Sequence, residues 1–137
     1  MHAKGILLTA ALIAFAPAAA DPQGTSPAEW KAPAHLPTGA QYRLIREDPE
    51  THGIEAIVRF PSGYEVLAHT HTVHETIVVI KGRLRLTAAG QVRTLKPGDH
   101  ASLPPGTPHA LKAKTWLRDV WFLTTTDGPY DLAYTAK

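Results

Sequence analysis

The chain has 137 residues, no cysteine and a formal net charge of +2. Without cysteine it can form neither disulfides nor thiolate–metal bonds, so its stability must come from packing and from any bound metal. Its basic residues are scattered along the sequence, and the lack of a concentrated basic face argues against nucleic acid as a partner.

The first 20 residues have the three parts of a secretory signal peptide. Lys4 gives a basic start, residues 6–15 are apolar, and Ala18-Ala19-Ala20 gives a small-residue end. The apolar stretch is too short for a membrane span, which needs about 20 residues, although an uncleaved anchor is the alternative. We therefore expect cleavage before Asp21, a periplasmic or secreted protein, and no membrane association after cleavage.

Residues 21–39 are predicted to form an extended N-terminal arm. The segment contains four prolines and has no hydrophobic period, and each proline removes a backbone donor and restricts the residue before it. Trp30 and Leu36 are the residues expected to dock the arm on the domain that follows. A loose tether is an equal alternative, and exchange of the arm with a partner chain is a weaker one.

Residues 40–137 read as one all-β domain. Short runs with β character recur about every ten residues, separated by glycine and proline, as in a barrel or sandwich. The run Thr76–Ile80 is apolar at nearly every position, which predicts a strand covered on both faces. The expected strands are 41–46, 54–60, 65–71, 75–81, 83–87, 91–95, 109–114 and 118–125.

Three histidines and one glutamate form the strongest candidate site. His69 and His71 are two positions apart in a predicted strand, so their side chains share one face. Glu75 keeps the same parity and joins them if no bulge intervenes, and His109 follows a distant turn. Imidazole and carboxylate groups suit divalent Fe, Mn, Ni, Cu or Zn. We predict one such metal ion, with His69, His71, Glu75 and His109 as its ligands.

Two motifs of this chain resemble those of the cupin superfamily. The first motif has a glycine, five residues, His-x-His, three residues, a glutamate, six residues and a glycine. The second has a glycine, five residues, Pro-x-Gly, two residues and a histidine. Ala113 stands where the family often has an asparagine, which is not a metal ligand. The matching residues are Gly63, His69, His71, Glu75 and Gly82 in the first motif, and Gly98, Pro104, Gly106 and His109 in the second.

The resemblance implies a double-stranded β-helix, a small jelly-roll-like barrel with the metal inside, and a homodimer of a single-domain exported cupin. It further implies a dioxygenase-type enzyme acting on a small enolisable or diketone-like molecule, with Glu75 as metal ligand and catalytic proton acceptor. A metal without redox chemistry would suit an isomerase or lyase instead. The alternative is a non-catalytic periplasmic module that binds or senses a small molecule.

His74 is expected to point away from the metal ligands. It is the neighbour of Glu75, and successive side chains of a strand lie on opposite faces. A bulge would change this and bring His74 close enough to assist the metal or carry a proton.

Overall fold

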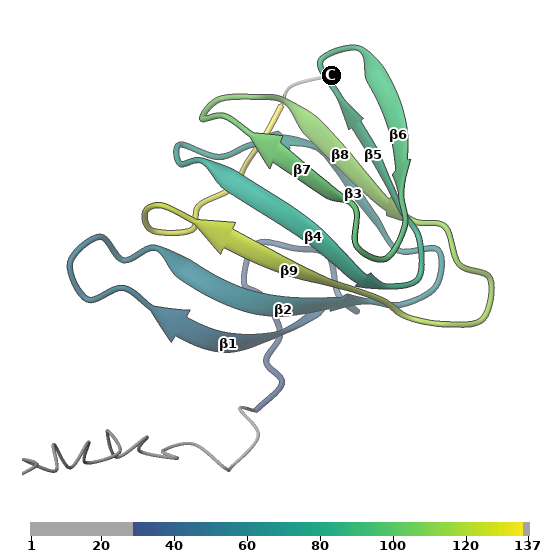
Figure 1. Ribbon diagram of the computed structural model, residues 1–137, viewed down its shortest axis with the longest axis horizontal. Coiled ribbons are helices and arrows are strands. Elements are labelled where there is room, and N and C mark those ends of the chain that lie inside the picture. The colour runs from purple at the N-terminus through teal and green to yellow at the C-terminus, as the bar shows by residue number, and fades with distance from the viewer. Residues whose placement is uncertain (1–28, 136–137) are drawn as a thin grey trace, which may run out of the picture.

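A computed structural model describes residues 29–135 (Figure 1). The predicted signal peptide, residues 1–20, and the first part of the predicted arm lie outside the described residues. Ten β-strands make up the secondary structure of the described chain, which contains no helix that could cross a membrane. The strands are β1 (Gln41–Glu47), β2 (Ile54–Phe60), β3 (Glu65–Thr70), β4 (Glu75–Lys81), β5 (Leu84–Ala88), β6 (Gln91–Leu95), β7 (His100–Leu103), β8 (His109–Ala113), β9 (Val120–Thr126) and β10 (Ala133–Tyr134).

The strands form two five-stranded antiparallel sheets. One sheet has the order β1-β2-β9-β4-β7, and the other has the order β10-β3-β8-β5-β6. Figure 1 shows the strands of the first sheet side by side in that order. The chain crosses between the sheets after β2, β3, β4, β6, β7, β8 and β9, so the two layers are built together. This confirms the predicted all-β fold.

All eight predicted strands are present, with ends that shift by at most two residues. Two further strands, β7 and β10, were not predicted. β7 has only four residues, His100–Leu103, between two proline-containing turns, and β10 is a two-residue pairing of Ala133 with Thr70 and of Tyr134 with His69. Such short segments contain too few residues to show a strand period.

The core lies between the two sheets. β2 and β9 alternate strictly, so that Val58, Phe60, Val120 and Phe122 point inward and are at least 92% buried. β4 alternates in the same way, and its outward-facing Ile80 is 47% exposed. The prediction that this strand is covered on both faces is therefore wrong. The outer face of β4 is apolar, which suggested a covered strand, but it is partly exposed.

Residues 29–39 of the predicted arm dock on the barrel. Lys31 pairs with Tyr42 of β1 through two backbone hydrogen bonds. The Trp30 ring meets the Trp121 ring edge-on, with centroids 5.3 Å apart, and the Arg43 guanidinium lies 4.5 Å from the Trp30 ring. Leu36 packs against the core. Both residues expected to dock the arm do so, which favours docking over a loose tether for this part of the arm.

Candidate metal centre

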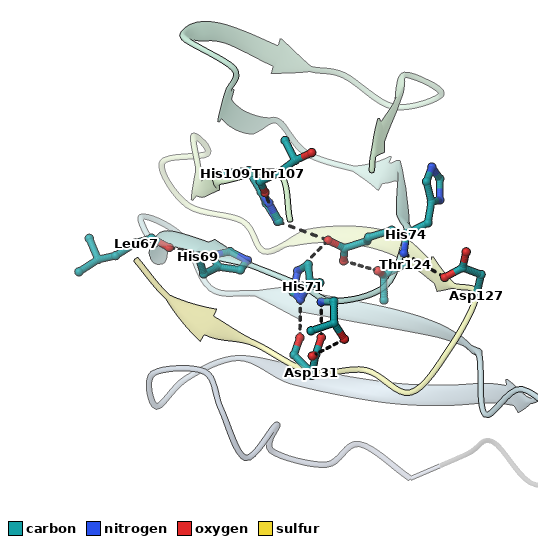
Figure 2. A network of polar contacts seen from close by, with 11 residues as sticks. Leu67, His69, His71, His74, Thr107, His109, Thr124, Asp127 and Asp131 are labelled. Atoms are coloured by element: carbon teal, nitrogen blue, oxygen red, sulfur yellow. Dashed lines mark hydrogen bonds and ion pairs between the residues drawn. The ribbon is translucent and has the colours of Figure 1, made fainter. Parts of the chain in front are cut away.

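The structure brings three of the predicted ligands together. His69 lies near the end of β3, His71 follows that strand, and His109 begins β8. His69 and His109 are direct partners across the β3–β8 ladder. All three side chains are buried, and each offers one ring nitrogen within 4.8 Å of the others. Figure 2 shows the three rings converging between the sheets. The cluster therefore has the spacing of a site that is able to hold a metal ion.

Backbone carbonyls orient all three rings in the same way. His69 Nδ1 lies 2.7 Å from the Leu67 carbonyl, and His109 Nδ1 lies 2.9 Å from the Thr107 carbonyl. His71 Nδ1 is bonded to the carbonyl of Asp131, 60 residues away in the sequence. A carbonyl only accepts, so each Nδ1 carries the proton and each Nε2 keeps a free electron pair. This is the tautomer that a metal-binding histidine requires.

A β-bulge in β3 supplies one of these carbonyls. The register of β3 on β8 shifts between Val66 and His69, and the two residues between them, Leu67 and Ala68, are both exposed. The extra residue interrupts the ladder and leaves the Leu67 carbonyl free to accept from the His69 ring. The bulge therefore sets the orientation of the His69 ring.

Glu75 reaches the cluster from the opposite sheet. It is the first residue of β4, and its Oε2 lies 3.0 Å from His71 Nε2 and 3.4 Å from His109 Nε2. The other carboxylate oxygen, Oε1, accepts a hydrogen bond of 2.6 Å from Thr124 Oγ1. The chain bends between His71 and Glu75, so the carboxylate arrives from the facing sheet and not along one continuous strand, as its parity had suggested.

The chemistry of these atoms fits a cation. His71 Nε2, His109 Nε2 and Glu75 Oε2 are buried and lack a hydrogen-bond partner, although they lie close together. With both Nδ1 atoms protonated, these are three electron pairs directed at one another. Such an arrangement is stable only with a positive charge between them, either a proton or a metal ion. Three imidazoles and one carboxylate form a donor set that divalent transition metals accept.

The protonation states also suit metal binding. Burial lowers the pKa of His69 to about 4, so this ring is neutral at pH 7. Burial opposes ionisation of Glu75, but His109, His71 and Thr124 outweigh it and lower the pKa of the carboxyl. For His71 the effect of burial is outweighed by the Glu75 carboxylate, which raises its pKa. Because its own pKa is lowered, Glu75 is an anion at neutral pH.

A cavity of about 270 Å³ adjoins the cluster. His69 and Glu75 form part of its wall, together with Thr124 and Tyr130. Most of the remaining lining is apolar and comes from both sheets and from the arm, including Leu36, Val58, Phe60, Val66, Leu111 and Phe122. A small molecule in this cavity would therefore meet the metal-binding residues at a polar wall and apolar side chains elsewhere.

His74 is not part of the cluster. Its Nε2 lies 2.7 Å from Ser102 Oγ on the outer side of the sheet, and its backbone N–H donates to Asp127. Figure 2 shows the ring pointing away from His69, His71 and His109. This agrees with the expectation that His74 faces the opposite side of the strand.

Sequence reasoning missed three residues around the centre. Thr124 holds Glu75, Asp131 holds His71, and the Tyr130 ring lies 5.0 Å from the His71 ring. None of them belongs to either histidine motif. For Thr124 a signal was available in the sequence. The alternation of β9 places it on the inner face, and a threonine among buried apolar side chains needs a hydrogen-bond partner. Asp131 and Tyr130 gave no such signal.

Residues 56–119 match the family model described as "Cupin domain". The chain is similar to "DNA damage-repair/toleration protein DRT102" of Arabidopsis thaliana, at 32% identity over 102 residues, which cover 73% of this chain and 31% of that protein. It is also similar to quercetin 2,3-dioxygenase of Bacillus subtilis, at 42% identity over 48 residues, which cover 34% of this chain and 14% of that enzyme. The chain therefore spans less than a third of the length of either relative.

The fold is shared with the DMSP lyase DddQ of Ruegeria pomeroyi. The two structures superpose with a TM-score of 0.65 at 22% identity, over 79% of this chain and 61% of the lyase. At this identity the likeness concerns the fold. Residues 29–135 therefore have the cupin fold, and their three buried histidines are able to hold a metal ion.

Proposed function

We propose that this cupin domain is a metal-dependent enzyme that acts on a small, mostly apolar molecule with an enolisable or diketone-like group. The observation that carries this proposal is that His69 and Glu75 belong both to the metal-binding cluster and to the wall of the cavity. A ligand in the cavity can therefore reach the centre directly. The cavity volume of about 270 Å³ suits a small molecule.

The residues divide into those that hold the ion and those that handle the substrate. His69, His71 and His109 would hold it, with Glu75 as a fourth ligand. The metal would supply Lewis acidity toward a substrate oxygen and, if it is redox-active, chemistry with dioxygen. Glu75 is ionised and oriented by Thr124, so its carboxylate would accept a proton from a substrate in the cavity.

Tyr130 is the second polar group available to a substrate. It lines the cavity beside the cluster, and its hydroxyl makes no hydrogen bond to the described residues. Burial raises its pKa, so the hydroxyl stays protonated at neutral pH. In this proposal it donates a hydrogen bond to an oxygen of the substrate and turns the molecule toward Glu75.

One sequence relative and one structural neighbour are enzymes, and the first of these supports a catalytic role. One is a quercetin 2,3-dioxygenase and the other a DMSP lyase. The first match favours the dioxygenase reading, and the second is compatible with the lyase reading for a metal without redox chemistry. We favour the dioxygenase type because the sequence match to that enzyme is 42% identical over 48 residues, whereas the likeness to the lyase is one of fold.

A non-catalytic binding or sensing module is the second candidate. It is favoured by the lining of the cavity, in which apolar side chains dominate and few groups other than Glu75 and Tyr130 could transfer a proton. Export to the periplasm and a homodimer remain predictions for either candidate.

The first experiment is elemental analysis of the protein purified without an affinity tag or chelator, followed by oxygen-uptake assays with acetylacetone and with quercetin. We expect about one metal ion per chain and oxygen consumption with at least one diketone or enol. Glu75→Gln should abolish uptake, and His109→Ala should lose most of the metal while the barrel remains folded by circular dichroism. His74→Gln is the matched control and should change neither.

Three results would separate the candidates. Stoichiometric zinc with no oxygen uptake would favour lyase or isomerase chemistry or ligand binding. Full metal occupancy in His109→Ala would refute the ligand assignment. Failure to take up any metal on titration would contradict the enzymatic proposal.

A further inference from the structure

The loop between β8 and β9 exposes two large apolar side chains. Trp116 and Leu117 are 88% and 84% exposed, whereas the other exposed large apolar side chains of the described chain reach at most 56%. The two other tryptophans, Trp30 and Trp121, pack against each other. Scattered apolar surface residues need no explanation, but two adjacent and almost fully exposed ones mark a contact surface.

The base of this loop is anchored to its neighbours. The Lys114 N–H donates to the Arg83 carbonyl at 2.9 Å, and the Ser62 hydroxyl donates to the Thr115 carbonyl. The Thr115 hydroxyl in turn donates to the Arg118 carbonyl, which closes the loop beneath the two apolar residues. The pair, which we call the Trp116–Leu117 tip, is therefore presented on a structured base.

Basic residues lie next to the tip. Lys114 and Arg118 flank it in the sequence, Arg83 adjoins Lys114, and all three are exposed. The nearby carboxylates are already engaged. Asp119 lies 3.4 Å from Arg59, and Glu65 lies 3.7 Å from Lys112. Among residues 29–135, the charge near the tip that has no ion-pair partner is therefore positive, which makes the tip complementary to an anionic surface.

The size and shape of the tip favour a lipid surface over a protein partner. A stable protein interface buries about 800 Å² on each partner, much more than two side chains provide. A membrane interface needs less: tryptophan and leucine enter the headgroup boundary while lysine and arginine contact anionic headgroups. We propose that the Trp116–Leu117 tip docks this domain on an anionic phospholipid membrane.

The tip lies at the end of the barrel opposite the metal centre. β8 begins at His109 beside the cluster and ends at Ala113, about 13 Å further along at the usual rise of a strand. Figure 1 shows the loop projecting beyond the strands at the right of the view. Docking would thus leave the metal centre free. This proposal differs from the expectation of no membrane association. That expectation considered only long apolar stretches, and a tip of two residues is too short to give such a signal.

The test is cosedimentation of the full mature protein with vesicles of phosphatidylcholine and phosphatidylglycerol. We expect binding at low salt that weakens as salt is added, and much weaker binding to pure phosphatidylcholine. Trp116→Ser and Leu117→Ser should each lower the partition coefficient about tenfold or more. Val92→Ser, which removes a half-exposed apolar side chain on β6, is the matched control and should bind like the parent protein.

Tryptophan fluorescence gives a second measurement, which reports insertion of the Trp116 ring directly. On insertion its emission should shift to shorter wavelength and should be quenched by brominated lipid, and Trp116→Phe should remove this signal while retaining most of the binding. The proposal is overturned if the parent protein does not bind anionic vesicles, or if Trp116→Ser binds as well as the parent. It is also overturned if the tip instead mediates self-association in sedimentation velocity.

Discussion

Each of the three clustered histidines is oriented by one backbone carbonyl. Leu67 and Thr107 lie two residues before the rings that they orient, so these two hydrogen bonds are local. Asp131 orients His71 from the far end of the chain. These contacts fix both the tautomer and the orientation of each ring. The side chains would therefore lose little conformational entropy when an ion binds.

Thr124→Val tests how Glu75 is held. Valine has nearly the shape of threonine but cannot donate to Glu75 Oε1, which Thr124 Oγ1 approaches to 2.6 Å. A buried carboxylate oxygen would lose its partner, so we expect a loss of about 1–3 kcal/mol in the unfolding free energy of the metal-free protein. Metal affinity should fall about tenfold or more. Chemical denaturation and chelator competition measure the two effects.

Thr125→Val is the control for this change. Thr125 neighbours Thr124 on β9 but faces outward and is only partly buried. It should leave metal affinity unchanged. Equal effects of the two substitutions would show that the loss reflects β9 in general and not the hydrogen bond to Glu75.

At the scale of elements, residues 127–131, which follow β9, hold the turn between β3 and β4 in place. The Asp131 carboxylate accepts from the Thr72 backbone N–H at 2.9 Å and from the Thr72 hydroxyl at 2.6 Å. The Asp127 carboxylate accepts from the His74 backbone N–H at 2.9 Å. The short turn between β3 and β4 is thus fixed at two points by one segment, and Figure 2 shows both contacts.

Asp131→Ala should loosen His71 without removing it. The Asp131 carbonyl remains, but the carboxylate that anchors it to Thr72 is lost. We expect metal affinity to fall about tenfold, less than for loss of a ligand, while the fold persists. Asp127→Ala removes the equivalent contact to His74, which is not a ligand, and should have little effect on affinity. Chelator competition on both variants decides whether the contact to Thr72 matters for the centre.

The elements also show what the sequence could predict. Strands with β-branched or alternating residues, such as β2, β4 and β6, were predicted with their observed ends. The four-residue β7 was missed, because its chain path is decided by pairing with β4 and not by its own residues. His69 and His71 could be found from the alternation of a strand, and Glu75 and His109 from the spacing of the two motifs. The contact from Asp131 could not, because it depends on how the end of the chain folds back.

At the scale of the molecule, the centre joins the two sheets. His69 and His109 belong to one sheet and Glu75 to the other. An ion bound by all of them would link the layers of a protein that has no disulfide. Metal binding should therefore raise the stability of the whole domain, since a ligand that binds only the folded state stabilises it.

The metal-free protein should be less stable in acid. Burial lowers the pKa of His69 from 6.5 to about 4, so below pH 6.5 the unfolded chain takes up a proton that the folded chain does not. Stability is therefore lost as the pH falls from about 6.5 to about 4. The pKa of His71 is raised, so its effect has the opposite sign. Protonation of this ring stabilises the folded chain fully below pH 6.5, and that stabilisation is lost as the pH rises through the folded-state pKa.

Urea denaturation at several pH values measures this effect. We expect the unfolding free energy to fall by about 1–2 kcal/mol between pH 6.5 and 4.5, allowing for partial solvent screening. The fall should be smaller in His69→Gln, whose side chain does not titrate. An unchanged pH dependence in this variant would assign the loss to other groups, with Glu75 as the first to test at lower pH.

The wall of the cavity has two origins, and they can change separately. The ligands and most of the apolar lining belong to hydrogen-bonded strands, whereas Leu36 and its neighbours belong to the arm. The arm is held near the cavity by Tyr64, which donates to the Pro37 carbonyl, and Tyr134, which donates to the His35 carbonyl. Substitutions in the arm can therefore alter which molecules fit without disturbing the ligands, so selectivity for a ligand can evolve while the chemistry of the centre is conserved.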